Sequence, residues 1–257
     1  KKSGSSTVSH LRFGPEPIGS TYLIEDADLV ACHQFGLLEP MRVLDRARDG
    51  ATLLVNSPYP ADEVWPHLPR TIQEQLLAKG IDLWVIDAYK VARKEGMGTR
   101  INTVMQPCFF QLADVLPPED AIAQIKASIE ATYGRRGRSM VERNFAAVDR
   151  SLAELSKVPV PAEIGLVAAP AAVSAIGAEA PDFVQRVTAR LLAGDGDLLP
   201  VSALPVDGTF PTGTAKYEKR AIATELPIWD PEICIDCAKC AVVCPHAAIR
   251  VKVFAPE

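Results

Sequence analysis

Apolar residues in the first hundred positions gather in short runs that are separated by one amphipathic segment. Residues 51–57 and 81–87 are dense in Leu, Val and Ile, which is typical of buried strands. Between them, residues 71–79 place their large apolar side chains on one helical face, with Thr71 as a candidate N-cap and Gly80 as a stop signal. Strand, helix and strand at this spacing predict a βαβ unit with 51–57 and 81–87 as adjacent parallel strands.

Weaker patterns surround this unit. Residues 21–24 and 29–32 are short apolar runs that favour strands or strand edges. Helical periodicity then covers residues 102–116, 118–133 and 139–157, and the second of these begins with Pro and two acidic residues, which suit a first helical turn. The sequence therefore predicts a parallel sheet with a helical cover, an α/β fold.

The pattern changes near residue 160. Pro alternates with Val over residues 158–161, and the sequence stays rich in Ala and Pro up to residue 181, as in a stiff extended connector. One short helix is predicted at 182–193, followed by a stretch from 194 to 213 that is punctuated by Gly and Pro and has no helical period. We place a domain boundary at this change.

Composition limits the function. The chain has 257 residues, 48% hydrophobic and 23% charged, and a formal net charge of −5. This balance provides no basic field for nucleic acid or for an acidic membrane surface. No apolar run reaches membrane-spanning length, and the first residues contain neither Met nor an apolar signal core. We expect no nucleic-acid or membrane partner, a cytoplasmic location, and a sequence that is cut at both ends.

The strongest chemical signal is a cysteine motif near the end of the sequence. Cys234, Cys237, Cys240 and Cys244 are separated by two, two and three residues and are followed by Pro245. This spacing is typical of [4Fe–4S] ferredoxins, in which the first three thiolates hold one cluster and the fourth holds a second cluster. The alternatives are a zinc site, which usually has two separated Cys pairs or Cys with His, and a set of core cysteines, which needs no fixed spacing.

The residues around this motif predict half of a ferredoxin domain. Residues 226–230 would form the strand before the cysteine loop, and residues 248–251 the strand after it. The predicted organisation is therefore an α/β domain at 1–160, an irregular connector at 161–225 and the first half of a two-cluster ferredoxin-like domain at 226–257.

Other candidate groups have simpler interpretations. His10 and His33 have no recognisable nucleophile or paired carboxylate beside them, so we interpret both as structural histidines. Cys32 and Cys108 lie in apolar surroundings and are expected to be inert core thiols.

The sequence resembles the pyruvate:ferredoxin (flavodoxin) oxidoreductases at three separated places. Residues 212–220, which end in Glu-Lys-Arg, are similar to the segment that precedes the ferredoxin domain in that family. Lys-Lys-Ser-Gly at 1–4, residues 7–14 and residues 20–24 are similar to the gamma-type domain of the family. The resemblance implies that the chain covers the gamma-type domain, the Glu-Lys-Arg segment and the start of the ferredoxin domain, and it favours a domain-docking role for Tyr217 to Arg220.

The resemblance implies an enzyme that decarboxylates pyruvate with thiamine diphosphate and Mg²⁺, transfers the acetyl group to coenzyme A, and passes electrons through [4Fe–4S] clusters to ferredoxin or flavodoxin. The thiamine diphosphate and Mg²⁺ sites would lie in domains that these 257 residues lack, so the fragment alone should be inactive. The intact enzyme would be a homodimer.

The resemblance also places coenzyme A contacts at Lys2, Asn102 and Asn144. A lysine suits a phosphate, and the amides suit the adenine or pantetheine groups. From the residues alone, Lys2 could equally be a solvated terminal lysine, Asn102 the N-cap of its helix and Asn144 an exposed helical residue.

Two other functions remain open from the sequence. The chain could be an electron carrier or scaffold in which a ferredoxin-like tail is fused to an α/β ligand-binding domain, or it could belong to an oxidoreductase for another 2-oxoacid.

Overall fold

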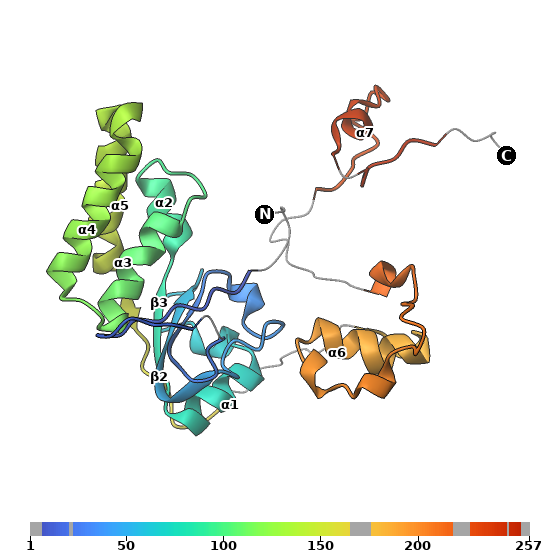
Figure 1. Ribbon diagram of the computed structural model, residues 1–257. Coiled ribbons are helices and arrows are strands. Elements are labelled where there is room, and N and C mark those ends of the chain that lie inside the picture. The colour runs from blue at the N-terminus through green and yellow to red at the C-terminus, as the bar shows by residue number, and fades with distance from the viewer. Residues whose placement is uncertain (1–6, 21–22, 165–175, 218–226, 246, 253–257) are drawn as a thin grey trace. The chain divides into compact units, whose positions relative to one another are not determined.

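The computed structural model describes residues 7–20, 23–164, 176–217, 227–245 and 247–252. The chain divides into two compact units, residues 1–220 and residues 221–257, which are described separately. The first unit contains the α/β domain and the connector, and the second contains the cysteine motif (Figure 1).

A four-stranded sheet forms the centre of the α/β domain (Figure 1). Its strands, in their order across the sheet, are β1 (Ala27–Cys32), β2 (Ala47–Asn56), β3 (Asp82–Ile86) and β4 (Ser156–Lys157). The first three are parallel, and Leu53 of β2 lies opposite Leu83 of β3. The prediction that 51–57 and 81–87 form adjacent parallel strands is therefore confirmed.

Helix α1 (Arg70–Lys79) connects β2 to β3 and ends where the sequence predicts. Gly80 adopts φ 59° after the last turn, a left-handed conformation that glycine accepts readily. The predicted N-cap was wrong: Pro69 occupies the cap position, and the Thr71 hydroxyl donates instead to Glu39 Oε1 at 3.3 Å. The proline begins the helix one residue earlier because its fixed φ suits entry into a helix.

Four helices follow the sheet unit: α2 (Ala88–Lys94), α3 (Asn102–Ala113), α4 (Pro118–Tyr133) and α5 (Arg138–Glu154). Short 3-10 turns lie at Phe35–Leu37, Trp65–His67 and Gly134–Arg136. The helix predicted to reach 116 stops at Ala113, because Asp114 takes a left-handed φ of 49°. The helix predicted to reach 157 stops at Glu154, because β4 then pairs antiparallel with the open edge of β3.

The two faces of the sheet bury separate apolar cores. Leu53 and Val55 of β2 point to one face, where α1 packs, whereas Leu54 points to the other face, where α2, α3 and α5 pack. This separation follows from the two-residue period of a strand. Each fully buried leucine contributes about 1.5–3 kcal/mol relative to exposure. A third cluster fills the space between α4 and α5.

Residues 176–217, which make up most of the described part of the connector, form mostly compact turns. The predicted helix at 182–193 is present as a π-helical segment, Val184–Thr188, that continues into α6 (Ala189–Leu192). Further 3-10 turns lie at Gly196–Leu198, Val201–Ala203 and Thr214–Tyr217. No helix in the described ranges is both long enough and apolar enough to cross a bilayer.

Within the residues of the second unit that the structure describes, there is one short helix, α7 (Lys239–Val243). The strands predicted at 226–230 and 248–251 are not formed in the described residues 227–230 and 248–251, which corrects the expectation. Ile228 and Trp229 are 91% and 67% exposed, so their apolar side chains gain little from burial in this conformation. A two-stranded ribbon without a core behind it is marginal in water.

Candidate functional site

Three loops meet at the carboxyl edge of the parallel strands, where open α/β sheets usually bind ligands. Asn56, at the end of β2 and only 3% exposed, joins them. Its Nδ2 donates to the His33 carbonyl at 3.0 Å, and its Oδ1 accepts from the Ala88 amide at 2.9 Å. Gln34 Nε2 donates to the Tyr89 hydroxyl at 2.6 Å, which links the same loops a second time. Side-chain hydrogen bonds therefore hold the three loops at the carboxyl edge together.

The two histidines of interest have structural surroundings. His10 Nδ1 accepts a hydrogen bond from the Ile24 amide at 3.0 Å. His33 follows β1, and desolvation lowers its pKa below the ordinary value, so it is neutral at pH 7. Beside this edge, Tyr59 stacks on His67 with ring centroids 3.6 Å apart. None of these contacts creates an acid–base pair.

Asn102 and Asn144, the predicted coenzyme A contacts, lie on neighbouring helices but in different surroundings. Asn102 is the exposed first residue of α3, and the N-cap position is held by Ile101 rather than by Asn102. Asn144 is 2% exposed within α5. The interpretation of Asn144 as an exposed helical residue is therefore wrong, and so is that of Asn102 as the N-cap.

A residue that sequence reasoning missed connects these two positions. Thr103, next to Asn102, donates from its hydroxyl to Asn144 Oδ1 at 3.2 Å. Asn144 Nδ2 in turn donates to the Met140 carbonyl at 2.7 Å. The structure thus presents Asn102 to solvent and uses Asn144 to hold the turn that carries it.

The loop before α3 shapes the same region. Gly96 and Gly98 adopt φ values of 69° and 64°, which side chains other than glycine accept poorly. Arg100, between this loop and α3, is exposed and next to the α3 entry. Lys2, the third predicted contact, lies outside the described residues.

Cys32 and Cys108 are buried, as expected for core thiols. Desolvation raises the pKa of Cys32, and it raises the pKa of Cys108 to about 12. Both side chains are therefore neutral thiols at pH 7 and poor nucleophiles. The six cysteines, all within the described residues, form no disulfide bond.

The cysteines of the motif lie at the surface of the second unit. Cys237 and Cys240 are exposed, and Cys234 and Cys244 are half-buried. The backbone turns twice through left-handed φ values, 51° at Asp236 and 55° at Ala238, on either side of Cys237. The Ala248 amide donates to Cys244 Sγ at 3.3 Å, the type of contact that stabilises a thiolate.

The donor set fits an iron–sulfur cluster, although the sulfurs are not brought together. Four thiols at this spacing, in an accessible loop with backbone N–H donors nearby, are the ligands that such clusters use. Within the described ranges, however, no three His, Cys, Asp or Glu side chains converge to form a metal-binding group. Metal binding at sites of this kind is coupled to folding, so the cluster itself would draw the four sulfurs together.

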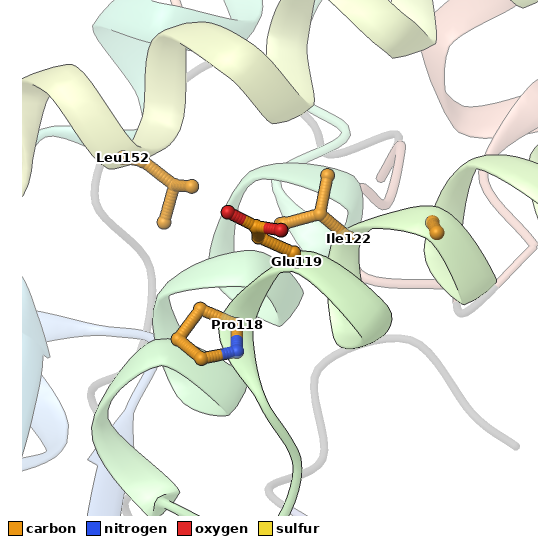
Figure 2. A pocket seen from close by; sticks show the side chains of 5 residues that line it. Pro118, Glu119, Ile122 and Leu152 are labelled. Atoms are coloured by element: carbon orange, nitrogen blue, oxygen red, sulfur yellow. The ribbon is translucent and has the colours of Figure 1, made fainter.

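An apolar hollow of about 380 Å³ lies elsewhere, between the start of α4 and the end of α5. Figure 2 shows Pro118, Glu119, Ile122 and Leu152 around it. It contains none of the predicted site residues, and we do not include it in the candidate site.

Comparison with protein families divides the chain into three matched regions. The family described as "Pyruvate ferredoxin/flavodoxin oxidoreductase" matches residues 1–154. A domain of unknown function, known as EKR, matches residues 170–223, and a 4Fe-4S binding domain matches residues 226–249, which include all four cysteines of the motif.

Individual relatives agree along the whole chain. The pyruvate-flavodoxin oxidoreductase of Rhodospirillum rubrum is 52% identical over 257 residues, covering 100% of this chain and 21% of that protein. The probable pyruvate-flavodoxin oxidoreductase of Escherichia coli is 47% identical over 100% of this chain and 22% of that protein. The pyruvate:ferredoxin oxidoreductase of Moorella thermoacetica is 46% identical over 97% and 21%, respectively. The chain thus spans about a fifth of the length of these relatives.

Among solved structures, the pyruvate oxidoreductase subunit PORC of Thermotoga maritima matches with a TM-score of 0.41 and 20% identity, over 52% of this chain and 66% of that chain. Since the family comparison matches residues 1–154, more than half of the sequence, the chain belongs to the pyruvate ferredoxin/flavodoxin oxidoreductase family.

Proposed function

We propose that the chain contributes coenzyme A contacts and iron–sulfur ligands to a pyruvate:ferredoxin or flavodoxin oxidoreductase. That enzyme converts pyruvate and coenzyme A to acetyl-CoA and CO2 and passes the electrons to ferredoxin or flavodoxin. The observation that carries the proposal is the order of the matched regions: the oxidoreductase family matches residues 1–154, and the cysteine motif follows inside the 4Fe-4S match at residues 226–249. An electron carrier or scaffold would need no oxidoreductase region of this kind.

The four cysteines have separate roles in this proposal. Cys234, Cys237 and Cys240 hold one [4Fe–4S] cluster, and Cys244 holds a second one. When bound, such clusters accept and release single electrons. The left-handed turns at Asp236 and Ala238 fold the loop around Cys237, and the Ala248 amide directs a positive dipole at Cys244 Sγ. The turns would shape the loop around the ligands, and the Ala248 amide would donate to a ligand sulfur.

Coenzyme A is assigned to the turn that enters α3. Asn102 offers an exposed amide that can both donate to and accept from the ligand. Asn144 is buried, and both ends of its amide are already hydrogen-bonded, so we give it a positioning role through Thr103 instead of direct contact. Lys2 is assigned to a phosphate of the ligand on the family resemblance alone.

Thiamine diphosphate and Mg²⁺ are assigned to other parts of the longer polypeptide. The chain spans about a fifth of its relatives, so the complete reaction belongs to the intact enzyme. We further propose that this enzyme is a cytoplasmic homodimer.

The test uses the intact enzyme that contains this chain, purified without oxygen. We expect reduction of flavodoxin or ferredoxin that requires both pyruvate and coenzyme A. A Cys237→Ala variant should lose acceptor reduction, whereas Cys32→Ala should retain it, since Cys32 lies in the core. A panel of pyruvate, 2-oxoglutarate and 2-oxobutyrate identifies the substrate. Reduction by another 2-oxoacid alone, or electron transfer with no dependence on a 2-oxoacid, would contradict the proposal.

A further inference from the structure

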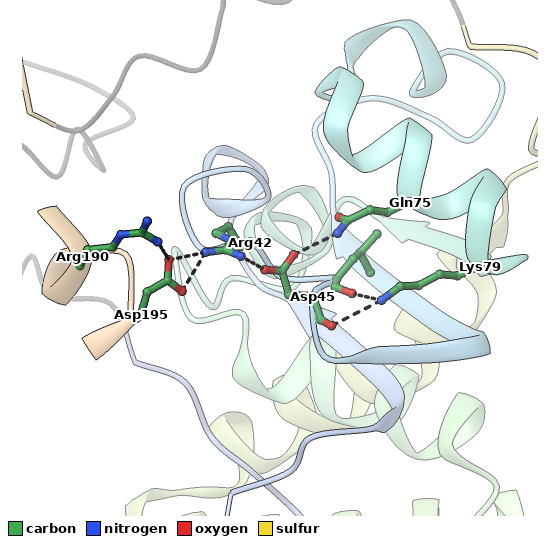
Figure 3. Close-up of polar contacts among 7 residues, drawn as sticks. Arg42, Asp45, Gln75, Lys79, Arg190 and Asp195 are labelled. Carbon is green, nitrogen blue, oxygen red and sulfur yellow. Dashed lines mark hydrogen bonds and ion pairs between the residues drawn. The ribbon is translucent and has the colours of Figure 1, made fainter. Parts of the chain in front are cut away.

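Arg42, in the loop between β1 and β2, binds two carboxylates at once (Figure 3). Its Nη2 lies 2.6 Å from Asp45 Oδ2 in its own loop. Its Nη1 lies 3.0 Å from each carboxylate oxygen of Asp195, 153 positions later in the chain. The two carboxylates raise the pKa of Arg42, so its charge is fixed. Arg42 therefore joins the α/β domain to the connector.

Helix α1 holds the loop that presents Arg42. Lys79 Nζ donates to the carbonyls of Leu44 and Ala47 at 2.8 and 2.7 Å. Gln75 Nε2 donates to Asp45 Oδ1 at 3.0 Å, which leaves the other oxygen of that carboxylate for Arg42. A continuous series of polar contacts, drawn in Figure 3, thus leads from α1 to the guanidinium.

The backbone of Arg42 supports the same interpretation. Its φ is 45°, in the left-handed region that disfavours side chains other than Gly, Asn and Asp. An arginine in that conformation is strained relative to glycine, and the surrounding contacts must offset this strain. The loop therefore holds a guanidinium where backbone preference alone would select glycine.

On the connector, Asp195 is also placed for this contact. It follows Gly194, whose φ of 80° reverses the chain after α6, and it occupies the N-cap position of the turn Gly196–Leu198. An aspartate at an N-cap commonly accepts from the backbone of its own turn, but Asp195 makes no such cap bond. Its carboxylate, with a side chain only 23% exposed, faces Arg42, and Arg190 lies 3.8 Å away.

The α/β domain and the described residues of the connector share no apolar cluster. The described residues of the connector have their own cluster, formed by Ile176, Ala180 and Val184 with Ala189 and Tyr217 at its edge. The three clusters of the α/β domain contain no residue of the 176–217 segment. Two bodies with separate cores and an ionic contact can come apart without exposing a core.

We propose that the segment 176–217, within the region matched by the domain of unknown function, is an intramolecular docking module. Its Asp195 binds in a site that the α/β domain preforms around Arg42. The docked state is held mainly by charge, so it is reversible and sensitive to salt. The partner of this surface is a carboxylate of the same chain, and the proposal is independent of coenzyme A and iron–sulfur binding.

In the test, one residue of the Arg42–Asp195 pair is substituted and the exposure of the region around the other residue is measured, with the whole chain at low ionic strength. Asp195→Asn should increase the rate at which an arginine-specific reagent modifies Arg42, because the connector releases the guanidinium. Arg42→Gln should increase amide hydrogen exchange in residues 194–199. An exposed ion pair contributes up to about 1 kcal/mol, so both increases should be up to about fivefold.

Arg48 is the matched control. It is 59% exposed, comparable with Arg42 at 52%, and it pairs with Asp28 at 2.6 Å, with no ion pair to the described residues of the connector. Its modification rate should not change in Asp195→Asn, and Arg48→Gln should not change exchange in residues 194–199. Thermal unfolding of each variant checks that the α/β domain remains folded.

Salt and a double variant complete the test. Raising the ionic strength should accelerate exchange in the unmodified chain and have little effect in Arg42→Gln, since the screened contact is already absent. Combining Arg42→Gln with Asp195→Asn should open the connector no further than either change alone, because both remove one interaction. The proposal would be overturned if the effects of the two substitutions were additive. It would also be overturned if Asp195→Asn left the modification rate of Arg42 unchanged and Arg42→Gln left amide exchange in residues 194–199 unchanged.

Discussion

The hydroxyl of Thr103 donates a hydrogen bond to Asn144 Oδ1, 3.2 Å away, and joins the first turn of α3 to the middle of α5. This contact links a buried amide to the exposed turn that carries Asn102. Of these two neighbouring residues, Thr103 contacts the rest of the protein and Asn102 is exposed to solvent.

Replacing Asn144 by Ala should lower the free energy of unfolding by about 1–3 kcal/mol, because the Thr103 hydroxyl loses its acceptor at a buried site. Chemical denaturation of the chain measures this. Asn102→Ala is the matched control, since an exposed substitution changes stability by no more than about 0.5 kcal/mol. Equal losses for the two variants would show that Asn144 has no special role in holding the turn.

Asn102→Ala should instead act on the ligand. In the intact enzyme we expect the coenzyme A requirement to rise about tenfold, which corresponds to about 1.4 kcal/mol for one lost hydrogen bond. Steady-state kinetics at saturating pyruvate measures the change. Gln106→Ala, at another exposed position of α3, should leave the requirement unchanged. An unaltered requirement in Asn102→Ala would remove this residue from the proposed site.

Much of the α/β domain could be predicted from hydrophobic periodicity. The strands at β2 and β3, the helix between them and the bounds of α4 follow from runs and stripes that the structure buries. The errors concern helix ends and the apolar run at 21–24, whose described residues 23 and 24 form no strand. Thr71 is a good cap by residue type, yet Pro69 occupies the cap position and the Thr71 hydroxyl donates to Glu39, 32 positions earlier in the chain. Such details depend on tertiary context that a local pattern does not contain.

The candidate site was less predictable than the fold, because its residues contact partners that lie far away in the sequence. Asn56 follows an apolar strand, as many polar residues do, and nothing local shows that it bridges the loops at His33 and Ala88. Arg42 and Asp195 are equally ordinary in sequence and meet only through the fold. The cysteine motif was predictable because its spacing itself carries the chemistry.

Asn56→Ala should destabilise the chain by about 2–4 kcal/mol, because it leaves the buried Ala88 amide and the His33 carbonyl without their side-chain partner. Asn56→Asp keeps the acceptor but loses the donor, and it places a charge at a position that is 3% exposed, so it should also be strongly destabilising. Denaturation midpoints with unchanged slopes provide the measurement. A loss below about 0.5 kcal/mol in both variants would mean that the loops hold together without this bridge.

Cys108 should make the fold less stable in alkaline solution. Its pKa is raised from 9.0 to about 12 by burial, so the folded chain keeps a proton that the unfolded chain releases above pH 9. The contribution of Cys108 to the free energy of unfolding is fully present below pH 9. Above pH 9 it falls by up to about 1.4 kcal/mol per pH unit, until the pH reaches the pKa of the folded state.

Cys108→Ala should therefore show a shallower decline than the unmodified chain when the free energy of unfolding is measured from pH 8 to 10.5. Its absolute stability is lower because a buried side chain is shortened, so the slopes are what must be compared. Parallel slopes would show that the thiol ionises in the folded state as readily as in the unfolded state.

The cysteine motif is expected to supply ligands to two different clusters. Cys237 lies between two left-handed turns and Cys240 lies within α7, whereas Cys244 follows that helix in extended backbone. The helix separates Cys244 from the loop, and Pro245 restricts the residue before it to extended conformations. Three thiolates can therefore gather on one side of the loop while the fourth is directed elsewhere.

In the intact enzyme, Cys237→Ala and Cys244→Ala should each disturb a different [4Fe–4S] signal in paramagnetic resonance of the dithionite-reduced protein. Cys108→Ala, which changes a buried thiol outside the motif, should leave both signals in place. The reason is that each substitution removes one of four sulfur ligands from a different cluster, and a cluster short of one ligand is lost or converted. If both substitutions remove the same signal and spare the other, all four cysteines hold a single cluster, and the spacing between Cys240 and Cys244 has to be explained by α7 bending back toward the loop.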